Sequence, residues 1–302
     1  MEEQLRKRKK HRHHKKRRHL GLKIFLSILL LIIIAVSGLA YGIYKNLEGT
    51  FNAAYVKGPQ TTAVNFSKSQ PFTTLLIETG TLNSKNTCLA AVVASTNVSS
   101  KQTTFVNFPV NATLPDGTTI DGTYESNGEN GLLQTTQNTL GVPINKIVQV
   151  DVNKMGELIE ATGGIVLQNA KTFVAGGYQF NQGTVNLSTA SQVEAYVTQV
   201  DANDQNATIT RIQNVSMALY NNIQKLTNKS NLTTNINYYR NILSAFSDTV
   251  KTDISFSEFK TILLNYNKAL RNTSKLNLHA DNNVISATEI TNVKQLFQKT
   301  LK

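Results

Sequence analysis

The stretch LGVPINKIVQVDVNKMGELIEATGGIVL, residues 140–167, decides the fold class. Residues 146–152 are rich in β-branched side chains and predict a strand, and residues 154–161 predict an amphipathic helix. Gly163-Gly164 is a helix-termination signal, and residues 165–167 predict a further short strand. A strand, a helix and a strand in succession indicate a layered α/β domain with a largely parallel or mixed sheet.

Outward from this stretch, the same alternation continues. Strands are predicted over 71–79, 88–95 and 101–108. The Asp-Gly and Asn-Gly pairs of 115–131 predict a loop or lid. Ser188 is the predicted cap of a helix that runs through STASQVEAYVTQ. Further helices are predicted over residues 132–140, 208–226, 238–246, 255–270 and 287–301.

The net charge of +12 is concentrated at the N-terminus. Residues 1–23 carry eleven Lys or Arg and two Glu, so the rest of the chain is nearly neutral. This distribution argues against a nucleic-acid groove on the folded part. Residues 24–44 contain no charged residue and are long enough to span a bilayer core of about 30 Å. The alternative, a cleaved signal peptide, usually has a shorter apolar stretch.

The positive-inside rule orients this predicted transmembrane helix. Residues 1–23 become a basic cytoplasmic tail, and the remainder lies outside the cell membrane of a single-pass protein. The polar residues 45–70 are predicted to form a juxtamembrane stalk, and 71–302 an extracytoplasmic domain.

Classical catalytic signatures are absent from the sequence. It has no P-loop, dinucleotide fingerprint or nucleophile elbow. Cys88 is the one cysteine, so no intrachain disulfide forms, and its apolar surroundings favour a core residue over a catalytic or metal-binding thiol. His279 lies in a polar segment and is interpreted as a surface residue, and no metal site is predicted.

The order of landmarks resembles the LytR-CpsA-Psr family of Gram-positive bacteria. Beside the basic tail, the apolar segment and residues 140–167, the resemblance rests on six stretches: LLIETGTL (75–82), NTCLAAVV (86–93), NFPVNAT (107–113), TIDGTYESNG (119–128), VEAYVTQVDAND (193–204) and ITRIQNVSMAL (209–219). It also includes TVKTDISFSEF (249–259) and so covers essentially the whole chain.

This resemblance implies a three-layer α/β domain whose central mixed sheet is flanked by helices and whose hydrophobic tunnel holds a polyprenyl-phosphate lipid. Active members are similar to Mg²⁺-dependent phosphotransferases that move teichoic acid or capsule-type glycopolymers from a lipid carrier to peptidoglycan. Arginines suit such chemistry because they bind phosphate through two parallel hydrogen bonds, and Mg²⁺ neutralises the leaving diphosphate.

This chain departs from the family at most charged positions. The family has Asp-x-Arg after its first strand, then Arg-Ser-Asp-Thr, Pro-Arg-Asp, two arginines after Ala-Tyr-Val, and Arg-x-x-Arg-Gln-Gln. Uncharged residues occupy these positions here: Gly80, Leu82, Asn86, Val110, Asn111, Thr198, Val200 and Thr208. Arg211 and Gln213 are retained, and Lys85 follows the place of one arginine. No arginine occurs between Arg18 and Arg211, so a shifted alignment restores none.

Three hypotheses follow. The first is a non-catalytic envelope protein that binds polyprenyl-phosphate lipid, or a partner in glycopolymer assembly, through Arg211, Gln213 and Lys85. The second is an active phosphotransferase that uses Arg211 and Lys85 with Asp201 or Asp204, and requires Mg²⁺. The third is a purely structural envelope protein. We favour the first, because hydrogen bonds to charged groups contribute about 1.5 to 3 kcal/mol each and many are missing.

Overall fold

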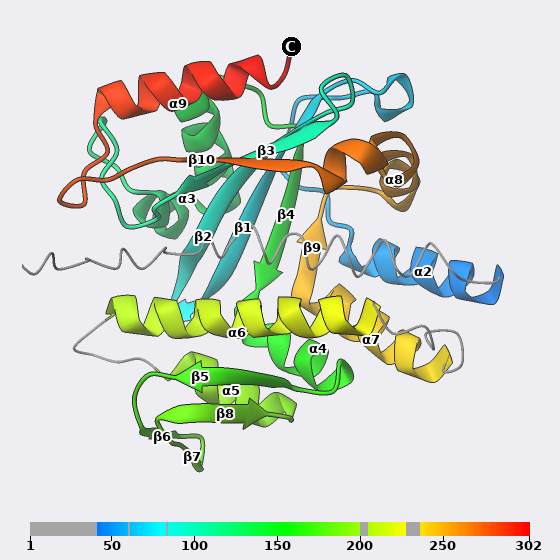
Figure 1. The fold of residues 1–302 in the computed structure, drawn as a ribbon, viewed down its shortest axis with the longest axis vertical. Helices are drawn as coiled ribbons and strands as arrows, with labels where there is room; N and C mark the ends of the chain where they lie inside the picture. Colours follow the sequence, from blue (N-terminus) through cyan, green and yellow to red (C-terminus); the bar gives the residue numbers. More distant parts are fainter. Residues whose placement is uncertain (1–40, 60, 83, 200–204, 228–235) are drawn as a thin grey trace, which may run out of the picture.

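The computed structural model describes residues 41–59, 61–82, 84–199, 205–227 and 236–302. Its centre is a six-stranded sheet in the order β10-β3-β2-β1-β4-β9 (Figure 1). The strands are β1 (Phe72–Leu82), β2 (Lys85–Asn97), β3 (Gln102–Phe108), β4 (Lys146–Asp151), β9 (Val250–Thr252) and β10 (Thr273–Asn277). The β1–β4 and β3–β10 pairs are parallel and the other three are antiparallel, so the predicted mixed sheet is confirmed.

Helices cover both faces of this sheet. Leu75 and Ile77 point into a core beneath α3 (Ile120–Leu140) and α9 (Ala287–Lys299). Leu76, between them, points into the opposite core, because side chains alternate along a strand. The helices of that second core include α4 (Met155–Ala161), α5 (Ala190–Thr198), α6 (Gln205–Thr227) and α7 (Ile236–Thr249). The layered α/β expectation is therefore confirmed.

The segment expected to be a stalk contributes buried residues. Helix α2 (Tyr41–Ala54) buries Phe51 and Ala54, and Phe51 stacks on Phe259 of α8 (Phe256–Arg271) with ring centroids 4.3 Å apart. The short helix η1 (Phe66–Lys68) buries Phe66 against Tyr266. Contacts with α8 therefore bury residues of a segment that its mostly polar sequence assigned to a stalk.

The membrane prediction lies mostly outside the described residues, because 24–40 fall in the undescribed range 1–40. Within the described part of the chain, no helix combines the length and the apolar character needed to cross a bilayer.

The predicted loop over 115–131 is wrong from Ile120 onward. Helix α3 begins at Ile120, which is fully buried, and the Thr119 side chain caps it by accepting a hydrogen bond from Gly122 N–H. The Asn127-Gly128 pair produces a kink instead of a loop, because Gly128 has a φ of 59° inside the helix. Burial of the apolar residues on either side outweighs the turn propensity.

A small β-rich subregion was not predicted. Strands β5 (Ile165–Asn169) and β8 (Gly183–Leu187) form one antiparallel ribbon, and β6 (Phe173–Ala175) and β7 (Tyr178–Phe180) form another. Only the first strand was expected from the sequence. The other three are only three to five residues long, so their alternation is a weak signal.

The helix cap of α5 lies one residue later than predicted. Thr189, not Ser188, is the N-cap, and it forms a capping box with Gln192. We expect Thr189→Ala to lower the free energy of unfolding by about 1 kcal/mol, because one helix N–H loses its acceptor. Urea denaturation measures this change. Ser188→Ala is the matched control, and an equal loss there would contradict the assignment of the cap.

Candidate functional site

Two of the family's charged motifs lie at the edge where β1 ends and β2 begins. Gly80 pairs with Thr87 across these two antiparallel strands, and Leu82 pairs with Lys85. Asn153, just after β4, fastens the end of β1, since its Nδ2 donates to Thr81 Oγ1 at 2.9 Å. This edge therefore holds Gly80, Leu82, Lys85 and Asn86 together.

Gly80 is closely surrounded. A Cβ atom at this position would lie 2.6 Å from Val152 Cγ2 and 2.9 Å from Leu89 Cδ1. Both contacts are closer than side chains in proteins normally approach. The place where the family carries its first aspartate is therefore filled by apolar side chains from β2 and from the turn after β4.

Two further substituted positions lie in the core. Leu82 and Val110 are 6% and 8% exposed and belong to the clusters on opposite faces of the sheet. Asn111, by contrast, is exposed, and its backbone carbonyl accepts a hydrogen bond from Asn283. At these two of the positions where the resemblance implies arginine, a buried apolar side chain stands in place of a charge.

Lys85 and Asn86 line an open pocket of about 480 Å³ together with Tyr124, Glu125 and Gly128 of α3. The Lys85 ammonium lies 3.4 Å from a carboxylate oxygen of Glu125. The Lys85 side chain is 69% exposed, so this ion pair is weak and water-screened. The pocket can present one mobile cation to an anionic ligand, but Glu125 opposes it.

Asp121 joins α3 to the same edge. Its Oδ1 accepts the Cys88 N–H at 2.9 Å, and its own N–H donates to the Val110 carbonyl. Burial raises the pKa of Asp121, and the Cys88 N–H opposes that shift. Cys88 is fully buried, which raises the pKa of its thiol far above the ordinary value. The interpretation of Cys88 as a core residue is therefore confirmed. Asp121 connects the start of α3 to β2.

Sequence reasoning missed a buried carboxyl group in β1, that of Glu78, two residues before Gly80. Glu78 is 3% exposed, and Ser216 of α6 donates a hydrogen bond to its Oε1 at 2.5 Å. Its Oε2 has no hydrogen-bond partner among the described residues. Burial raises the pKa of Glu78 to about 7, although the Ser216 bond acts in the other direction. An acidic residue inside the apolar run LLIETG was the available signal.

Arg211 lies in different surroundings from Lys85. Its guanidinium carbon lies 4.7 Å from the ring centre of Phe173 and 5.7 Å from that of Tyr196. These rings belong to β6 and α5 on the α6 side of the sheet. Stacking on aromatic faces orients an arginine without using its hydrogen-bond donors.

The other predicted positions are spread over α5, α6 and the link between them. Thr198 ends α5 and bonds back to the Glu194 carbonyl, while Thr208 is fully buried in α6. Gln213 is also in α6. Val200, Asp201 and Asp204 lie outside the described residues.

Mg²⁺ fits poorly with the residues at the family's acidic positions. Those positions hold Gly80, which has no room for a side chain, and the amides Asn86 and Asn111. Mg²⁺ in proteins prefers carboxylate oxygens. Among the residues that the structure describes, no group of three or more His, Cys, Asp or Glu side chains could hold a metal ion.

Comparison with known proteins decides the family. The sequence profile of the LytR_cpsA_psr family matches residues 46–302. This chain belongs to the LytR-CpsA-Psr family. The resemblance seen in the sequence motifs is thus confirmed, and the match begins at residue 46, within the segment that the sequence assigned to a stalk.

Relatives within the family share the fold at low identity. A protein of Enterococcus faecalis named polyisoprenyl-teichoic acid–peptidoglycan teichoic acid transferase TagU is 28% identical over 263 residues, which are 82% of this chain and 85% of that protein. The crystal structure of gbs0355 from Streptococcus agalactiae is 20% identical and matches with a TM-score of 0.55, over 80% of this chain and 91% of that one. That of B. subtilis TagV is 19% identical, with a TM-score of 0.53 over 77% and 98%.

Proposed function

We propose that this protein is a non-catalytic LytR-CpsA-Psr member that holds a polyprenyl-phosphate lipid during cell-wall glycopolymer assembly. The setting is the outer face of the cell membrane, with residues 1–23 as a cytoplasmic tail and 24–44 as a single transmembrane helix. An envelope protein engaged in the same assembly is the alternative partner. No nucleic acid is expected to bind the exported domain.

One observation carries the proposal: the packing around Gly80. Val152 and Leu89 fill the volume that an aspartate would need. Leu82, two residues on, points into the core. A phosphotransferase needs charge at this edge to stabilise a metal-bound diphosphate, and each 1.36 kcal/mol of lost stabilisation lowers the rate about tenfold.

Lipid binding requires fewer charged groups than phosphoryl transfer does. Apolar surface can hold a polyprenyl chain and a cation can hold its phosphate, without the metal-binding carboxylates that phosphoryl transfer needs. Arg211 and Lys85 are the cations that we assign to this role, and Gln213 the polar neighbour on α6.

The second candidate is glycopolymer transfer from a lipid carrier to peptidoglycan. It is favoured by the name of the Enterococcus relative, which covers most of both chains. In that case Arg211 would bind the diphosphate, and Mg²⁺ would require ligands beyond the substituted positions.

A transfer assay separates the two candidates. The full-length chain in detergent is mixed with a polyprenyl-diphosphate glycan, Mg²⁺ and an acceptor glycan. We expect saturable lipid binding without transferred product. Arg211→Ala should weaken lipid binding by about tenfold, as expected for loss of a charged hydrogen bond.

Lys299→Ala, a change at an exposed lysine of α9, is the charge-matched control and should leave binding unchanged. Product formation that disappears in Arg211→Ala would overturn the non-catalytic proposal and establish the second candidate. Absence of lipid binding would instead support a purely structural envelope role.

A further inference from the structure

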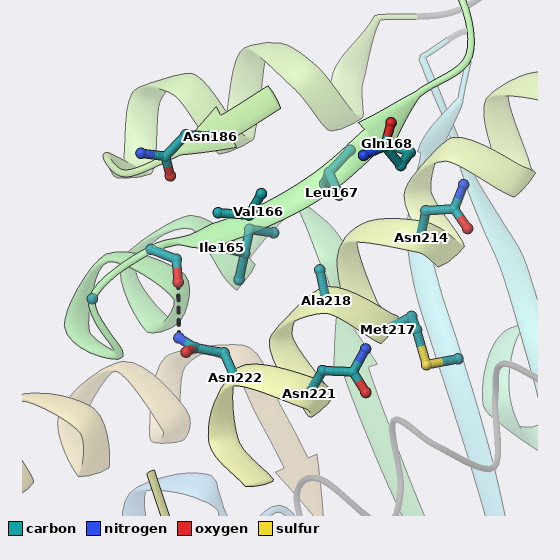
Figure 2. Close-up of a pocket in the computed structure, with 12 residues that line it drawn as sticks. Ile165, Val166, Leu167, Gln168, Asn186, Asn214, Met217, Ala218, Asn221 and Asn222 are labelled. Atoms are coloured by element: carbon teal, nitrogen blue, oxygen red, sulfur yellow. Dashed lines mark hydrogen bonds between the residues drawn. The ribbon is translucent and has the colours of Figure 1, made fainter. Parts of the chain in front are cut away.

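A groove lies between β5 and α6, away from the β1–β2 edge that holds Gly80 and Lys85. It has a volume of about 550 Å³ and is open to solvent (Figure 2). One wall comes from the exposed face of the β5–β8 ribbon, where Val166 pairs with Asn186. The other wall is the face of α6 that carries Asn214, Met217 and Asn221. The groove is therefore built by elements from both sides of the undescribed link 200–204.

The lining of the groove combines carboxamide and apolar side chains. Of its 12 residues, five are carboxamides and none is ionisable. A carboxamide both donates and accepts hydrogen bonds. A lining of this type matches ligands with hydroxyl and acetamido groups, which also donate and accept. It offers no ion pair to a phosphate polymer or to a cationic ligand.

Two of the amides already have partners in the fold. Asn222 Nδ2 donates to the Thr162 and Gly164 carbonyls, at 3.0 and 2.8 Å. Gln168 Nε2 donates to Thr184 Oγ1 at 2.9 Å. Figure 2 shows the first of these sites, where Asn222 closes one end of the groove against the start of β5.

Three other amides remain available along the groove. The side chains of Asn186, Asn214 and Asn221 make no hydrogen bond with any other residue that the structure describes. They extend from both walls, Asn186 from β8 and the other two from α6 (Figure 2). Between them lie Val166, which is 63% exposed, and Met217. Apolar surface flanked by amides suits a ring face or an acetamido methyl group.

We propose that this groove binds an uncharged saccharide chain rich in hydroxyl and acetamido groups. The inference deepens the proposed function, because it names the polymer chemistry that a non-catalytic envelope protein would hold beside its lipid, and it rests on that function only for the biological setting. Asn214, Asn221 and Asn186 supply the direct hydrogen bonds, and Val166 and Met217 contact the apolar faces.

The test uses chitotetraose, a neutral tetramer of N-acetylglucosamine, and the full-length chain in detergent. Calorimetric titration should detect saturable binding. The double variant Asn214→Ala/Asn221→Ala should bind about tenfold more weakly, as expected for the loss of two neutral hydrogen bonds. Gln179→Ala, an exposed amide of β7 outside the groove, is the control and should bind as the wild type does.

Two other probes define the alternatives. The fully deacetylated, cationic tetramer and an uncharged N-acetyl tetra-alanine amide should bind at least tenfold more weakly than chitotetraose. Preference for the peptide would overturn the saccharide assignment in favour of a protein segment. Equal affinity in the double variant, or no binding of chitotetraose, would also overturn it. No phosphate ligand is used, so these outcomes are independent of the lipid assay.

Discussion

The stability of the Glu78→Gln variant relative to the wild type should rise between acidic pH and pH 8. Glu78 is buried between β1 and α6, and its pKa lies near 7 in the folded state against an ordinary value of 4.5. The folded protein therefore binds this proton more tightly than the unfolded chain does. The contribution of Glu78 to wild-type stability is therefore greatest below pH 4.5 and is lost as the pH rises through 7, by about 3 kcal/mol in all.

The glutamine variant has no proton to lose at this position. The difference in free energy of unfolding between variant and wild type should therefore change by about 3 kcal/mol in favour of the variant between pH 4.5 and pH 8. The cost of burying the glutamine amide does not depend on pH, so it cancels when the differences at the two pH values are compared.

Urea denaturation at a series of pH values measures this effect. Glu194→Gln, at an exposed position of α5, is the matched control and should show no such change. A difference for Glu78→Gln that stays constant with pH would show that this carboxyl group is solvated in the folded protein.

The second large effect is expected at Gly80. Gly80→Ala should lower the free energy of unfolding by about 1 to 3 kcal/mol, because its Cβ would overlap Val152 and Leu89. Gly80→Asp, which restores the family's residue, should cost about 4 kcal/mol or more at pH 7, since it also buries a charge.

A double-mutant cycle attributes the cost to this contact. In a Val152→Ala background, Gly80→Ala should be less destabilising than in the wild type by about 1 kcal/mol. Gly49→Ala is the control, because Gly49 lies in α2 with no atom within 4 Å of its added Cβ, and it should be neutral or slightly stabilising. If Gly80→Asp is tolerated without loss, the edge has room for the family's carboxylate, and the non-catalytic proposal loses its main support.

Much of the architecture could be predicted from the sequence. The strands β1 to β4 carry dense β-branched and apolar runs, and α6, α8 and α9 carry apolar residues at helical spacing. The elements that escaped prediction are short, as β9 and β10 are, or depend on burial by distant residues. Ile120 is an example, since its helix begins within a turn-like sequence because Ile120 enters the core under β2.

The residues of the candidate site could be named from the sequence, but their arrangement and their surroundings could not. The order of motifs singled out Gly80, Leu82, Lys85 and Asn86, and the register of β1 and β2 places them side by side at one edge. Their environments were not predictable. The Lys85 side chain is in water, whereas Leu82 is in the core, and the local sequence does not reveal either environment.

The sequence by itself determined the family, through the order of its motifs, and the shortage of charge, through the absence of any arginine between Arg18 and Arg211. Both are properties of the linear chain. Only the tertiary structure decided that Val152 closes the space beside Gly80, that Ser216 meets Glu78 across 138 residues, and that amides of α6 and β8 face one groove. The reason is physical: these contacts join residues far apart along the chain, and the packing of α6 and α4 against the sheet brings them together.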